Sequence, residues 1–85
     1  MKTILYFSAP WCVPCHQMKP AFTALMEEIN QKYELIDVAE NHAAATKYKV
    51  RGVPTIIVLE DGEITARATG SRTREQLLKL INGEE

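Results

Sequence analysis

The feature that most constrains this chain is its pair of cysteines, Cys12 and Cys15, which directly follows a short apolar run. The sequence has only these two cysteines. At a spacing of three on the first turn of a helix, the two sulfur atoms can cycle between a dithiol and a disulfide. A helix N-terminus favours an anion and can lower the pKa of a thiol from about 8.5 into the range of roughly 3.5–7.5. We therefore expect Cys12 to be an exposed nucleophile and Cys15 to be more buried and to attack second.

Length and charge exclude several classes of function. A chain of 85 residues is expected to form a single domain, residues 1–85. A net charge of −1 gives no reason to expect nucleic acid or an anionic membrane as a partner. No stretch approaches the roughly 20 apolar residues that span a bilayer, and the first residues lead into a strand rather than a signal peptide. We expect a cytoplasmic monomer, in which a cysteine pair is catalytic or binds a metal.

Apolar periodicity and turn residues predict seven elements in the order β-α-β-α-β-β-α. Strands are expected at 2–7, 33–38, 56–59 and 63–69, and helices at 13–31, 40–48 and 73–83. Leu35 and Ile36 form the apolar centre of the second strand. Asp61-Gly62 predicts a hairpin, and Thr73 with Gln76 has the form of a capping box. A right-handed crossover makes the first two strands parallel, so the prediction is an α/β fold: a four-stranded mixed sheet with helices on both faces.

Several separated segments, taken together, resemble the thioredoxin family. They are residues 9–15 (Ala-Pro-Trp-Cys-Val-Pro-Cys), Pro20, residues 47–55 (Lys-Tyr-Lys-Val-Arg-Gly-Val-Pro-Thr), Asp61-Gly62 and Gly70. Each falls where thioredoxins place the corresponding residue, and the resemblance covers almost the whole chain. It implies a minimal thioredoxin fold, because thioredoxins usually carry an extra strand and helix before the motif strand.

The resemblance also implies a function and a site. The function is that of a small thiol–disulfide oxidoreductase, which reduces protein disulfides through a mixed disulfide with the cysteine pair. It would need no cofactor and no metal, and a flavin-dependent, NADPH-linked thioredoxin reductase would reduce it again. The family further implies a cis peptide bond between Val53 and Pro54. The expected substrate groove consists of Trp11, Val13, Pro14, Val53, Pro54, Gly70 and Ser71.

Three positions depart from the family pattern. Val13 replaces the usual glycine after the first cysteine. Tyr6 stands where thioredoxins place a buried aspartate, and Tyr33 replaces its usual lysine neighbour. We expect Tyr6 in the core and Tyr33 at the edge of the core. Loss of the buried acid should slow the attack by Cys15 near neutral pH, unless water or the Tyr6 hydroxyl relays the proton.

Other functions could use the same residues. A glutaredoxin-like reductase would use glutathione, although Trp11 and the lack of a later Gly-rich stretch argue against it. Residues 12–16 also spell the C-x-x-C-H pattern of covalent haem attachment, but the expected elements are not those of an exported helical protein. Zinc could take both cysteines with His16 and His42, and a non-catalytic, redox-sensing or metal-binding module is a further alternative. We expect His16 on the surface, where its cation could favour a nearby thiolate.

Overall fold

The computed structural model describes residues 1–84 and contains the seven predicted elements in the predicted order. The strands are β1 (Lys2–Ser8), β2 (Tyr33–Asp37), β3 (Thr55–Glu60) and β4 (Glu63–Thr69), and the helices are α1 (Val13–Glu28), α2 (His42–Lys47) and α3 (Arg74–Ile81). They form a four-stranded sheet in the order β2-β1-β3-β4. β1 is parallel to β2 and antiparallel to β3, which is antiparallel to β4. This mixed sheet confirms the predicted fold class.

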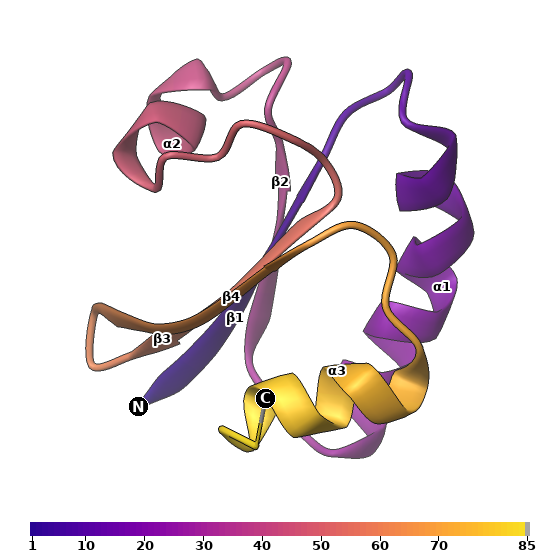
Figure 1. The fold of residues 1–85 in the computed structure, drawn as a ribbon, viewed down its shortest axis with the longest axis vertical. Coiled ribbons are helices and arrows are strands. Elements are labelled where there is room, and N and C mark those ends of the chain that lie inside the picture. Colours follow the sequence, from indigo (N-terminus) through magenta and orange to yellow (C-terminus); the bar gives the residue numbers. More distant parts are fainter. Residues whose placement is uncertain (85) are drawn as a thin grey trace.

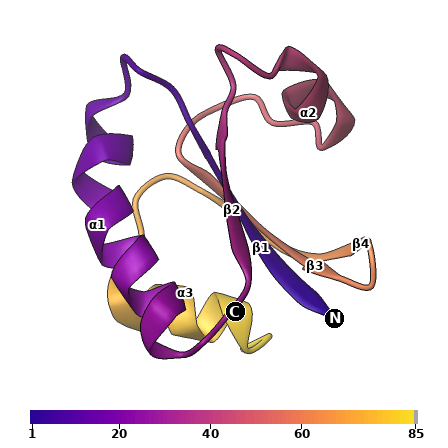
Figure 2. The ribbon, with the colours of Figure 1, turned by 180° about the vertical axis from the view of Figure 1, so that it is seen from behind.

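The sheet separates two layers of the core, and strand β1, in the interior of the sheet, contributes side chains to both. Ile4 and Tyr6 point to one face, while Leu5 and Phe7 point to the other, because side chains alternate along a strand. Helices α1 and α3 cover the first face, with α2 on the opposite side (Figures 1 and 2). The larger layer is made by buried residues of the sheet and of α1 and α3: Ile4, Tyr6, Met18, Phe22, Leu25, Met26, Ile56, Val58, Ala68, Leu77, Leu80 and Ile81.

Two local signals in the sequence give the predicted turns and caps. Asp61 and Gly62 both have positive φ angles, 53° and 87°, as a two-residue hairpin of the I′ type requires. Thr73 caps α3, since its side chain accepts a hydrogen bond from the Gln76 amide while the Gln76 side chain accepts one from the Thr73 amide. Both predictions are therefore confirmed.

The bounds of most elements differ from the prediction by one to three residues, and two helix ends show why. α1 ends at Glu28 rather than at residue 31, because Ile29 caps the helix and Asn30 takes a positive φ of 55°. α2 begins at His42 rather than at residue 40, because Asn41 caps it through a bond to the Ala44 amide. Leu35, at the apolar centre of β2, is 45% exposed, because β2 is an edge strand.

Within residues 1–84 no helix is long and apolar enough to cross a membrane.

Candidate active site

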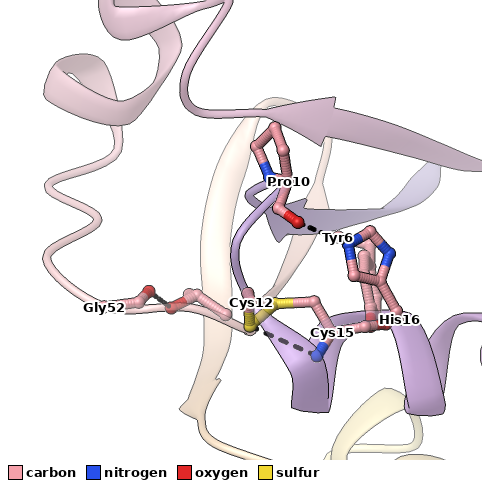
Figure 3. The surroundings of a disulfide bond; sticks show 7 residues. Tyr6, Pro10, Cys12, Cys15, His16 and Gly52 are labelled. Carbon is pink, nitrogen blue, oxygen red and sulfur yellow. Dashed lines mark hydrogen bonds between the residues drawn. A yellow bond between two sulfur atoms is a disulfide. The ribbon is translucent and has the colours of Figure 1, made fainter.

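The cysteine pair lies at the junction between β1 and α1. The chain leaves β1 through a turn in which the Cys12 amide donates to the Ala9 carbonyl at 3.1 Å. Cys12 and Cys15 are joined by a disulfide, and their Cα atoms are 5.3 Å apart (Figure 3). A turn of three residues, 9–11, thus connects the end of β1 to Cys12.

Cys12 is the N-cap residue of α1. Its Sγ accepts a hydrogen bond from the Cys15 amide at 3.2 Å, and its carbonyl accepts one from the His16 amide at the same distance. Pro14 occupies the first turn, where its missing N–H costs no helical bond. The sulfur thus faces the positive end of a 16-residue helix, an environment that stabilises a thiolate once the disulfide is reduced.

The two cysteines differ in exposure in the predicted order. Cys15 is fully buried and Cys12 is only 7% exposed, so the expectation that Cys12 is exposed is wrong. Cys12 is covered because it packs in a small cluster with Ala9, Val38 and Val53. Its neighbours Trp11 and Val13 instead project outward and are 69% and 62% exposed.

The Val53–Pro54 peptide bond is cis, as expected. Val53 packs against the cysteine cluster, while the Pro54 side chain is buried. The Pro54 carbonyl accepts a hydrogen bond from the Gly70 amide at 2.8 Å, which ties the end of β4 to the same loop. Gly70 has a φ of 98°, a conformation that residues with a side chain rarely adopt.

Most of the expected groove residues line two hollows. Trp11 and Val53 line one hollow together with residues that were not expected in the groove, namely Val38, His42, Ala45, Val50, Arg51 and Gly52. Pro14 and Ser71 line the other, with Gln17, Met18, Ala21, Arg72, Thr73 and Arg74. The additional residues were not assigned to the groove because they come from α1, α2, the first residue of α3 and the loops around α2 and before α3. No local pattern connects them to the cysteines.

Tyr6 lies beneath the cysteine pair. Its ring is fully buried against Phe22, with ring centroids 4.7 Å apart, and its hydroxyl donates to the Cys15 carbonyl at 2.7 Å (Figure 3). Burial raises the pKa of Tyr6 to about 12. The phenol is therefore neutral at physiological pH. Tyr33 is half-buried and meets Phe22 edge-on, so the core and core-edge predictions for both tyrosines are confirmed.

The two histidines lie in different places. His16 is exposed and its Nε2 lies 2.8 Å from the Pro10 carbonyl oxygen, whereas His42 lines the hollow beside Trp11. The proposed zinc ligands are therefore not gathered around the cysteines. Among residues 1–84 no group of three or more histidine, cysteine or acidic side chains is arranged to hold a metal ion.

Comparisons with known proteins agree on one family. The family model described as Thioredoxin matches residues 1–83. The thioredoxin of Bacillus subtilis is 41% identical over 78 residues, which are 89% of this chain and 75% of that protein. The thioredoxin of Haemophilus influenzae is 32% identical over 81 residues, which are 93% of this chain and 76% of that protein.

Solved structures give the same result. A mutant thioredoxin from Halobacterium salinarum superposes with a TM-score of 0.90 and 36% identity, covering 98% of this chain and 74% of that one. Fasciola hepatica thioredoxin also gives a TM-score of 0.90, with 32% identity over 99% of this chain and 81% of that one. These matches assign the cysteine pair to a family whose chemistry is thiol–disulfide exchange. The chain belongs to the thioredoxin family and is a thiol–disulfide oxidoreductase that reduces protein disulfides.

Proposed function

We propose that Cys12 is the attacking nucleophile and that Cys15 resolves the mixed disulfide. The Cys12 thiolate attacks one sulfur of the substrate disulfide, forms a new S–S bond and releases the other substrate sulfur as a thiolate. The Cys15 thiolate then attacks Cys12 Sγ, which releases the second substrate sulfur and closes the Cys12–Cys15 disulfide. Two electrons pass to the substrate in total.

The observation that carries this assignment is the position of Cys12 Sγ at the N-cap of α1. Bonding to the Cys15 amide and the helix dipole both favour a negative charge on that sulfur. Cys15 has no exposure and can meet only a partner that is already bound to Cys12. A substrate must therefore meet Cys12 first.

The substrate is proposed to dock around Cys12 in the predicted groove. Trp11 and Val13, the residues before and after Cys12 in the sequence, offer exposed apolar surface, and such patches on soluble proteins often mark contact sites. Pro14, Val53 and Ser71 extend this surface through the two hollows. Pro54 and Gly70 do not line either hollow, but their backbone hydrogen bond joins the segment that follows β4 to the segment that contains Val53.

Trapping with single-cysteine variants tests the assignment. Cys15→Ser leaves the nucleophile but removes the resolving thiol, so it should accumulate a stable mixed disulfide with a disulfide-containing protein such as insulin. Cys12→Ser, the matched control, should trap none. Both variants should be followed by non-reducing electrophoresis and mass spectrometry. Equal trapping by the two variants, or trapping by Cys12→Ser alone, would contradict the assigned order of attack.

The family implies protein disulfides and a thioredoxin reductase as partners. We propose that a flavin-dependent, NADPH-linked reductase supplies the electrons, and that the domain acts as a monomer without a resident cofactor. Insulin turnover measured with NADPH and such a reductase, and separately with glutathione, tests the source of electrons. Turnover with glutathione alone would favour the glutaredoxin-like alternative. A cytoplasmic location stays a prediction.

A further inference from the structure

The side chain of His16 makes a contact that the proposed mechanism does not use. Its Nε2 lies 2.8 Å from the carbonyl oxygen of Pro10, the residue before Trp11 (Figure 3). A carbonyl oxygen can only accept a hydrogen bond, so Nε2 must carry the hydrogen and donate it. Both the neutral ring in this tautomer and the imidazolium can make this bond.

His16 also makes a second hydrogen bond to the same turn, through its backbone amide. The His16 amide donates to the Cys12 carbonyl at 3.2 Å, while the ring donates to the Pro10 carbonyl. His16 therefore holds the chain on both sides of Trp11. The Trp11 side chain is 69% exposed, so little core packing is available to fix it.

We propose that His16 is a positioning residue, which fixes the Pro10–Trp11 peptide and so orients the Trp11 ring for substrate docking. The inference rests on the proposed docking role of Trp11. Pre-organised contact surfaces bind more tightly because less conformational freedom is lost on binding. His16 acts through this bond and not through its charge.

Other charged groups share the surroundings of His16. Lys19, from the next turn of α1, and Asp37, at the end of β2, line the same hollow as the His16 ring. One group is cationic and the other anionic, so the field in that hollow has no single sign. A role through charge must nevertheless be separated by experiment from a role through hydrogen bonding.

Two substitutions make this separation. His16→Leu removes both the donor and the charge. His16→Gln removes the charge but keeps an amide N–H that can reach the Pro10 carbonyl. If the hydrogen bond matters, His16→Gln should behave like the native protein. If the charge matters, it should behave like His16→Leu.

The first readout is the motion of Trp11 itself. Trp11 is the only tryptophan in the chain, so time-resolved fluorescence anisotropy reports on this one ring. His16→Leu should increase the amplitude of the subnanosecond component, because the hydrogen bond to the Pro10 carbonyl is lost, and His16→Gln should restore the native amplitude. The position of His16 on the surface means that both variants should fold, which circular dichroism checks.

The second readout separates docking from chemistry. With insulin as substrate, His16→Leu should raise KM by roughly 2- to 10-fold, the factor that the loss of one hydrogen bond gives, with kcat little changed. Its rate with a small aromatic disulfide and the apparent pKa of Cys12, from alkylation with iodoacetamide, should remain native. His16→Gln should restore KM.

Three outcomes would overturn the proposal: native anisotropy and KM in His16→Leu, failure of His16→Gln to rescue, or a change in the Cys12 alkylation profile that accounts for the loss of rate. Trp11→Ala serves as the control for the docking role. If Trp11→Ala leaves KM unchanged, the proposed groove is wrong, whereas the anisotropy of the His16 variants still tests whether His16 orients the ring.

Discussion

The hydroxyl group of Tyr6 can be removed with almost no other change to the site. Tyr6→Phe keeps the ring, and with it the packing against Phe22, but deletes the hydrogen bond to the Cys15 carbonyl. A bond of this kind contributes about 0.5–1.5 kcal/mol to the free energy of unfolding. For a domain of this size, a loss of about 1 kcal/mol lowers Tm by roughly 4–8 °C.

The free energy of unfolding that Tyr6→Phe loses should become smaller at high pH. Burial raises the pKa of Tyr6 to about 12 in the folded protein, against about 10 for an unfolded chain. The folded state therefore holds the phenolic proton more tightly than the unfolded state. The contribution of the neutral phenol is fully present below pH 10 and is lost as pH rises toward 12, so native protein and variant should converge over that interval.

Urea unfolding of the oxidised proteins, followed by circular dichroism at pH 7 and at several values between about 9.5 and 12, measures both effects. Tyr48→Phe is a matched control, because the Tyr48 ring is half-buried against Phe7 and its hydroxyl makes no hydrogen bond within residues 1–84. A Tyr6→Phe variant as stable as Tyr48→Phe at pH 7, or a difference that widens above pH 10, would refute the reasoning.

The same variant tests the proton relay. A phenol with a pKa of about 12 does not exchange its proton readily at neutral pH. The Tyr6 hydroxyl also already donates its hydrogen to the Cys15 carbonyl. We therefore expect Tyr6→Phe to reduce disulfides at the native rate between pH 6 and 9. Tyr6→Asp would place a carboxyl group at the position that thioredoxins use for one, and stopped-flow rates across pH would show whether it speeds resolution by Cys15. Identical profiles for the native protein and Tyr6→Asp would remove the idea that the missing acid limits the rate.

Three further changes should act mainly on stability. Thr73→Ala removes the cap of α3 and should cost about 0.5–2 kcal/mol in urea unfolding, whereas Thr73→Ser should keep most of it. Phe22→Ala should cost about 3–5 kcal/mol, because the ring is fully buried between two tyrosines; a loss below about 1 kcal/mol would contradict this packing. Glu28→Gln removes an exposed ion pair with Arg74 and should cost less than about 1 kcal/mol, with no difference remaining in 1 M salt.

Sequence reasoning succeeded where the signal is local. The hairpin at Asp61-Gly62 follows from the need for two successive positive φ angles, and the capping box follows from side chains three residues apart. The continuous apolar run in β1 predicted a strand, and the structure buries that strand on both faces. In each case the physical cause lies within a few residues of the feature.

The failures have causes outside the local sequence. α1 ends early because Asn30 adopts a left-handed conformation that glycine more often supplies. The exposure of Leu35 was not predicted either way: no strand within residues 1–84 pairs with the outer side of β2, and the identity of the residue does not reveal that position. The bonds from Tyr6 to Cys15 and from His16 to Pro10 join residues whose approach depends on how α1 sits against the sheet. No pattern in the sequence specifies that approach.

The Sγ atom of Cys12 has both a structural and a chemical role. It caps the first turn of α1 by accepting a hydrogen bond from the Cys15 amide, and it is also part of the disulfide. Reduction therefore changes the acceptor of this hydrogen bond from a disulfide sulfur to a thiolate. A thiolate accepts a hydrogen bond more strongly than a disulfide sulfur does. We therefore expect the hydrogen bond at the beginning of α1 to be stronger in the reduced protein than in the oxidised one. The chemical shift of the Cys15 backbone N–H should then report the oxidation state without any added label.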